Sequence, residues 1–91
     1  MSQNDKNDKI EFPLEFDFKV IVTNDMPENQ NLEQILSILR SINVSSGKYT
    51  SKTSENAKYI SFTIKLKIID EKQFKKLYSE IKKLPNLRMA L

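Results

Sequence analysis

The stretch KYISFTIKLKI, residues 58–68, decides the fold of this chain. From Ile60 onward its even-numbered residues are all apolar, namely Ile60, Phe62, Ile64, Leu66 and Ile68. Its odd positions are polar or amphipathic, namely Tyr59, Ser61, Thr63, Lys65 and Lys67. Strict alternation over this length is typical of a β-strand with one buried face. The stretch therefore predicts a long central strand.

Three further segments have strand character. Residues 15–23 alternate in the same way, with Phe16, Phe18, Val20 and Val22 on one side. Residues 48–53 are mostly polar or β-branched and contain two lysines, which predicts a short edge strand, and residues 54–57 predict the turn after it. Residues 87–91 alternate again, with Leu87, Met89 and Leu91 opposite in direction to Arg88 and Ala90. The chain thus supplies four strands.

Two segments between these strands have helical spacing. The apolar residues of the first are Leu32, Ile35, Leu36, Leu39 and Ile42, and those of the second are Phe74, Leu77, Tyr78, Ile81 and Leu84. Asn31 with Gln34 and Asp70 with Gln73 have the spacing of N-terminal cap pairs. Residues 24–30 are then a loop. Gly47, the single glycine, is expected to adopt a left-handed conformation after the first helix.

The resulting order is strand, helix, strand, strand, helix, strand. Two crossover units joined by a hairpin give an α+β, ferredoxin-like split βαβ sandwich, with a four-stranded antiparallel sheet in the order 4-1-3-2. Both helices then cover the face that carries Phe18 and Phe62. Residues 1–9 contain no apolar residue after Met1, so residues 1–10 are expected to be a disordered tail, and residues 11–91 a single domain.

The other face of the sheet is left open and is the candidate interaction face. We expect it to present Lys19, Ile21, Tyr59, Lys65, Lys67 and Arg88. Residues 1–46 contain 4 basic and 8 acidic groups, a net of −4, whereas residues 47–91 contain 11 and 4, a net of +7. Such an imbalance is typical of a surface for nucleic acid or an acidic partner, although a lysine-rich chain also uses lysine simply to solvate its surface.

The residues that are missing argue against most enzyme classes. The chain has no cysteine and no histidine, and one glycine cannot form a glycine-rich phosphate loop. Asp70 with Glu71 and Asp5 with Asp8 are the local carboxylate pairs, of which the first fits a helix cap and the second lies in the expected tail. We therefore expect no catalytic residues, no metal and no cofactor. With no long apolar run or leader, the chain is expected to be a soluble cytoplasmic protein without membrane contact.

Several short segments resemble the bacterial YbeD-like family of small proteins of unknown function. They are residues 12–20 (FPLEFDFKV), 47–49 (GKY), 59–63 (YISFT), 77–78 (LY) and 88–91 (RMAL), in the same order as in that family. The similarity extends over residues 11–91. It implies a ferredoxin-like, ACT-like fold and supplies no catalytic or binding residue.

The loop before the first helix allows a second hypothesis. ACT domains bind amino acids at this position, where an Asp-x-Pro-Gly stretch begins the helix. Asp25-Met26-Pro27-Glu28 is similar, with Glu28 in place of the glycine. Asp25, Pro27 and Glu28 are therefore candidates for a small-molecule ligand loop. A glutamate carboxylate would repel the carboxylate of an amino acid, and an ordinary Asx-Pro turn explains the same residues.

Three functions remain open from the sequence. The favoured one is a non-enzymatic regulatory or protein-interaction module, which binds an unidentified protein partner or forms a weak homodimer. The first alternative is RNA binding through the open sheet face, although that face lacks the paired outward aromatics of an RNA-recognition motif. The second is sensing of a small metabolite at the loop of Asp25, Pro27 and Glu28.

Overall fold

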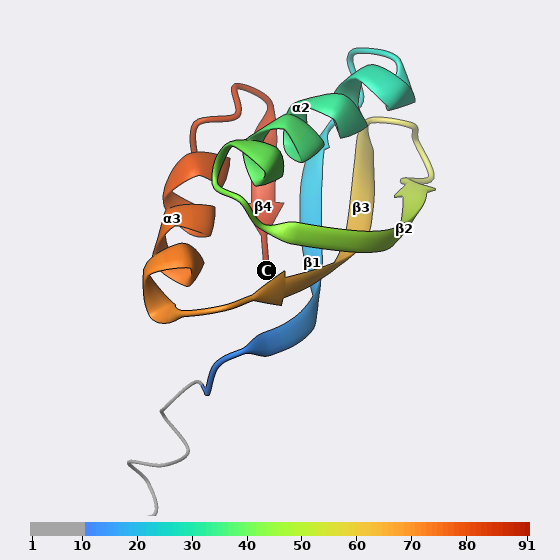
Figure 1. Cartoon of the computed structure of the whole chain (residues 1–91). Coiled ribbons are helices and arrows are strands. Elements are labelled where there is room, and N and C mark those ends of the chain that lie inside the picture. Colours follow the sequence, from blue (N-terminus) through green and yellow to red (C-terminus); the bar gives the residue numbers. More distant parts are fainter. Residues whose placement is uncertain (1–10) are drawn as a thin grey trace, which may run out of the picture.

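The computed structural model describes residues 11–91, so the tail expected at residues 1–10 lies outside the described residues. Four strands and two helices follow in the expected order (Figure 1). They are β1 (Leu14–Thr23), α2 (Glu28–Ser41), β2 (Ser45–Thr53), β3 (Tyr59–Ile68), α3 (Glu71–Ile81) and β4 (Leu87–Ala90).

The strands form one antiparallel sheet in the order β2-β3-β1-β4, which is the predicted order read from the opposite edge. β1 and β3 are the central pair, joined in continuous register from Leu14 opposite Ile68 to Thr23 opposite Tyr59. Both helices lie on one side of the sheet, as Figure 1 shows. The ferredoxin-like α+β sandwich predicted from the sequence is confirmed.

The core lies between the helices and the alternating apolar positions of β1 and β3. Its fully buried residues include Phe18, Val20 and Val22 from β1, and Ile60, Phe62, Ile64, Leu66 and Ile68 from β3. Ile35, Leu39, Leu77 and Ile81 cover them from the two helices. Tyr78 packs edge-on against Phe18, with ring centroids 5.5 Å apart. Its burial raises the pKa of the Tyr78 hydroxyl above the ordinary value, because ionisation is disfavoured away from water.

The two predicted cap pairs have different outcomes. At α3 the prediction is confirmed, because the Asp70 carboxylate accepts a hydrogen bond from the Gln73 backbone N–H at 2.8 Å. At α2 it is wrong, since the helix begins at Glu28 and Pro27 is its cap. The Pro27 carbonyl accepts the backbone N–H groups of Gln30 and Asn31, both at 3.0 Å. The expected loop at residues 24–30 therefore ends three residues earlier.

Asn31, which was expected to cap α2, is instead a fully buried residue within it. Its side-chain oxygen accepts a hydrogen bond from the Asn86 amide at 2.9 Å. The amide nitrogens of Asn31 and Asn86 also donate to the backbone carbonyl of Thr23, at 3.4 Å and 3.1 Å. These bonds join the start of α2, the end of β1 and the turn before β4.

The role predicted for Gly47 is also wrong. Gly47 lies inside β2, which begins at Ser45 rather than at Lys48, and its φ is not positive. The left-handed residue after α2 is Asn43, with φ of 60°. Asparagine tolerates this conformation better than most residues other than glycine. The register of β2 against β3 shifts between Ser46 and Tyr49, so Gly47 takes part in a β-bulge.

Candidate interaction face

The sheet face opposite the helices carries all six residues predicted for it. Lys19, Ile21, Tyr59, Lys65 and Lys67 occupy the positions of β1 and β3 that alternate with the buried ones. Arg88 reaches the same face from β4, where its guanidinium lies 5.5 Å from the centroid of the Tyr59 ring. Because each strand alternates between two faces, burial of Phe18 and Phe62 fixes the outward direction of their neighbours.

A β-bulge in β4 adds a residue that the sequence pattern assigned to the core. Ile21 pairs with Met89 but Val22 pairs with Leu87, so β4 contains one extra residue at Arg88. Met89 consequently stands opposite Ile21 on the open face and is 49% exposed. The prediction that Met89 and Leu91 share the buried side with Leu87 is wrong, because Leu91 is exposed and Ala90 packs against the core.

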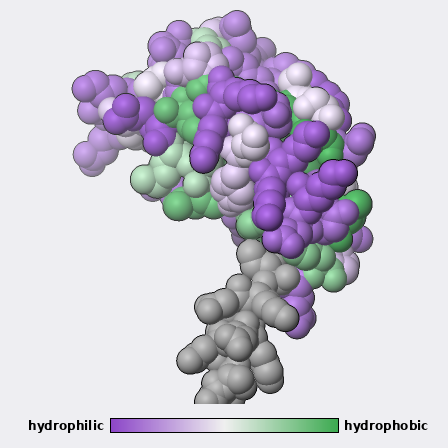
Figure 2. Space-filling model, turned by 90° about the vertical axis from the view of Figure 1, so that its left-hand side faces the viewer, coloured by the Kyte–Doolittle hydropathy of each residue, from purple (hydrophilic) through white to green (hydrophobic). Residues whose placement is uncertain are grey.

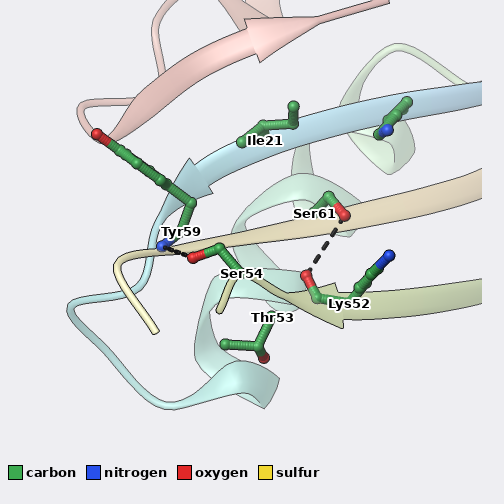
Figure 3. Close-up of a pocket in the computed structure, with 7 residues that line it drawn as sticks. Ile21, Lys52, Thr53, Ser54, Tyr59 and Ser61 are labelled. Atoms are coloured by element: carbon green, nitrogen blue, oxygen red, sulfur yellow. Dashed lines mark hydrogen bonds between the residues drawn. The ribbon is translucent and has the colours of Figure 1, made fainter. Parts of the chain in front are cut away.

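Tyr59 and Ile21 form the centre of two shallow hollows on this face (Figure 3). One hollow has a volume of about 250 Å³ and includes Lys19 and Lys52, and the other has about 240 Å³ and includes Arg88 and Met89. In Figure 3 the Tyr59 side chain extends from β3 across the neighbouring strand. We use the term Tyr59 patch for this surface, whose residues are Ile21, Tyr59, Met89, Lys19, Lys52 and Arg88.

The turn between β2 and β3 holds Tyr59 in place. Its backbone N–H donates to the Ser54 hydroxyl at 3.0 Å, and its carbonyl accepts the Ser54 N–H at 2.9 Å. The Arg88 guanidinium over the ring adds a cation–π contact. Tyr59 is therefore a half-buried aromatic side chain with one flank open, as in the anchor positions of protein interfaces.

The open face is strongly basic. Strand register places Lys19, Lys52, Lys65 and Lys67 on it, with the carboxylates of Glu15 and Asp17. Two more cations reach it from bulges, Lys48 beside Asp17 and Lys65, and Arg88 over Tyr59. Asp17 lies 3.7 Å from the Lys65 amine, an exposed contact that contributes little to stability. Within residues 11–91, Lys19, Lys52 and Arg88 take part in no ion pair. The Tyr59 patch therefore combines an apolar centre with three available cations.

The solvent face of α3 is a second basic surface. It carries Lys72, Lys75 and Lys76, and Lys82 and Lys83 follow in the turn at the end of the helix. Figure 2, which views the molecule from this side, shows mainly hydrophilic colour. Lys75 pairs with Glu71 at 3.4 Å and Lys83 with Glu80 at 3.0 Å. This surface lacks the apolar centre of the Tyr59 patch, so it has the character of a solvated helix face.

The three residues of the candidate ligand loop lie together at the junction of β1 and α2. Asp25 accepts a hydrogen bond from the Thr23 hydroxyl at 3.0 Å, and Pro27 caps α2 with its carbonyl. The Glu28 carboxylate accepts the Ser51 hydroxyl at 2.9 Å and so links α2 to β2. Each polar group has a partner within the chain, which gives this junction a structural role.

The described part of the chain contains no group of three or more histidine, cysteine, aspartate or glutamate residues that could hold a metal ion. None of the helices between residues 11 and 91 is long and apolar enough to cross a membrane.

Several solved structures share this fold at low sequence identity. A Helicobacter pylori protein solved in solution has a TM-score of 0.74 and 24% identity, and the match covers 100% of this chain and 94% of that one. The ACT domain of the Chlorobium tepidum GTP pyrophosphokinase has a TM-score of 0.65 and 8% identity, and the match covers 86% of this chain and 95% of that one. The P2 domain of the Thermotoga maritima chemotaxis kinase CheA was solved in complex with the response regulator CheY. It has a TM-score of 0.58 and 11% identity, and the match covers 85% of this chain and 92% of that one.

The ACT-like character implied by the sequence resemblance is thus confirmed at the level of the fold. No curated protein matches the sequence. Residues 7–91 match a family described as a protein of unknown function, DUF493, in agreement with the YbeD-like segments. The chain therefore belongs to the DUF493 family of proteins of unknown function.

Proposed function

We propose that this protein is a non-enzymatic interaction module that binds an acidic partner protein on the open face of its sheet. The observation that supports this most strongly is the Tyr59 patch, where a half-buried aromatic and two apolar side chains lie among three cations. An exposed apolar centre with a charged rim is typical of protein docking sites, and complementary charge speeds and directs association. The absence of histidine and cysteine from the sequence supports a non-enzymatic role.

A solved relative in fold gives general support to protein binding. The CheA P2 domain, with the same fold, is described in complex with a response regulator. At 11% identity this likeness concerns the fold alone. RNA binding is less well supported, since Tyr59 is the one outward aromatic of β1 and β3 and Arg88 lies over its ring. Stacking of successive bases needs more than one aromatic platform.

A comparison of two charge-reversed variants tests this proposal. One variant carries Lys19→Glu and Lys52→Glu in the Tyr59 patch. The matched control carries Lys72→Glu and Lys76→Glu on α3 and changes the net charge equally. Proteins retained from a cell extract by the wild type are identified by mass spectrometry, purified, and titrated calorimetrically against all three proteins.

We expect an acidic partner whose dissociation constant rises at least about ten-fold for the patch variant and less than about two-fold for the control. Its affinity should also fall with rising salt. Equal loss of the partner from both variants would refute docking at the open face.

Two further measurements examine the other occupants. The first is light scattering over a concentration series. A mass of twice the 10.6 kDa of one chain for the wild type, and of one chain for the patch variant, would assign the face to a second copy instead. Tight binding of a single-stranded RNA that is lost only in the patch variant would assign it to nucleic acid. Either result would overturn the proposal of an acidic protein partner.

A further inference from the structure

The outer strand of the sheet is little covered by the rest of residues 11–91. All nine residues of β2, Ser45–Thr53, are exposed, including the aromatic Tyr49 at 46%. β2 pairs with β3 on one side, and it stands at the rim of the sheet with its other edge unpaired within residues 11–91 (Figure 1). Natural sheets usually shorten, cover or interrupt such an edge, because it offers free hydrogen-bonding groups to another chain.

The register identifies the backbone groups that point outward. The Ser54 N–H bonds to the Tyr59 carbonyl at 2.9 Å, which makes Ser54 and Tyr59 a hydrogen-bonded pair. Such pairs alternate along an antiparallel ladder, so Lys52 and Thr50 also bond to β3. The N–H and C=O groups of the residues between them must face away from the sheet. These outward groups belong to Tyr49, Ser51 and Thr53.

The side chains of β2 divide in the same alternating way. Thr50 and Lys52 lie opposite Thr63 and Ser61 and therefore project from the open face, with Lys48 from the neighbouring bulge. Tyr49, Ser51 and Thr53 project from the helix side, where Ser51 bonds to Glu28. A strand added outside β2 would meet lysines on one face and Tyr49 on the other.

Charge favours an acidic segment over a second copy of this chain. If two β2 strands paired antiparallel about Ser51, Lys52 of each copy would lie diagonally across from Lys52 of the other on the same face. Like charges so placed are destabilising, which is one way in which lysines protect an edge from self-pairing. The same lysines would attract carboxylates on every second residue of a partner strand.

We infer that the acidic partner binds as an extended segment that adds a fifth strand to the free edge of β2. The segment has acidic residues on the open face, beside Lys48 and Lys52, alternating with apolar residues beside Tyr49. Backbone hydrogen bonds to Tyr49, Ser51 and Thr53 supply affinity, and the alternating side chains supply specificity. This inference rests on the proposed function, since it specifies how the partner of the Tyr59 patch is held.

The test uses the whole chain and a short synthetic peptide in which glutamate and valine alternate. Two N-methylated forms are made, one methylated at the valines and one at the glutamates. In a strand, alternate N–H groups face the same way, so only one of the two forms can lose its bonds to β2. If the peptide methylated at the valines no longer binds, the segment adds antiparallel to β2. If the peptide methylated at the glutamates no longer binds, the segment adds parallel to β2.

A matched pair of protein variants makes the same test by changing β2 and not the peptide. Ser51→Pro removes one outward N–H, and Ser51→Ala removes the hydroxyl while retaining that N–H. Proline is tolerated at edge positions whose N–H faces solvent. We expect the peptide dissociation constant to rise at least about ten-fold for Ser51→Pro and less than about two-fold for Ser51→Ala. Amide exchange at Tyr49, Ser51 and Thr53 should slow when the peptide binds.

The outcomes separate this inference from the proposed function. If the peptide binds but neither N-methylation nor Ser51→Pro changes its affinity, strand addition is wrong while acidic docking on the open face stands. If the peptide does not bind at millimolar concentration, strand addition is also wrong. The purified partner titrations described above then decide the proposed function separately.

Discussion

The buried amide pair of Asn31 and Asn86 should contribute measurably to stability. Asn31 is fully buried and makes two hydrogen bonds, at 2.9 Å to the Asn86 amide and at 3.4 Å to the Thr23 carbonyl. In the Asn31→Ala variant both bonds are lost, and each is worth about 1 kcal/mol net. The Asn86 amide keeps its own bond to Thr23, so no donor is left entirely unpaired. We therefore expect the free energy of unfolding to fall by about 2 kcal/mol.

Urea denaturation followed by circular dichroism measures this loss, and the melting temperature should fall by about 8 to 16 °C. Asn29→Ala is the control, because it makes the same chemical change at an exposed position in the first turn of α2. It should cost less than about 0.5 kcal/mol. The double variant Asn31→Ala with Asn86→Ala should give a coupling energy of about 1 kcal/mol. A coupling near zero, or equal effects of Asn31→Ala and Asn29→Ala, would refute the buried pair.

Three further substitutions test other features. Gln34→Met should be neutral or stabilising by up to about 1 kcal/mol, because the buried Gln34 side-chain nitrogen has no partner within residues 11–91; a clear loss in urea midpoint would contradict this. Gly47→Ala should stabilise by about 0.4 to 1 kcal/mol, since a Cβ would lie 3.7 Å from the Lys65 Cβ and φ is not positive; destabilisation would show that Gly47 needs glycine geometry. Burial raises the pKa of Tyr78, so the unfolded chain ionises first and wild-type stability should fall above about pH 10. In melting curves, the Tyr78→Phe variant should lose less stability at alkaline pH than the wild type. An equal loss in both proteins would contradict this role of Tyr78.

The architecture could be predicted because the residue pattern of each central strand indicates which of its side chains are buried. In β1 and β3 every buried position alternates with an exposed one, so period and face follow from the sequence alone. The cap at Asp70 was also predictable, because its partner Gln73 lies within the same turn. The open face followed directly from the burial of Phe18 and Phe62.

The errors arose where the deciding partner is distant in sequence. Asn31 fits a cap pair locally, but its bond to Asn86 joins residues 55 positions apart. The left-handed residue after α2 is Asn43 and not the single glycine. Both residue types tolerate that conformation, so composition alone does not show which of the two adopts it. Met89 was missed because the period-two pattern of residues 87–91 continues through the bulge without a break. Lys52 was noted only as protection of an edge, and register was needed to place it beside Tyr59.

The extra residue in β4 lets Leu87 and Met89, two positions apart, face opposite sides of the sheet. Deletion of Arg88 would remove the bulge and leave plain alternation, with Leu87 still opposite Val22 and Met89 still opposite Ile21. What such a deletion would remove is the guanidinium that lies over the Tyr59 ring. One inserted residue thus supplies a cation to the open face without turning any other side chain of β4 away from its place.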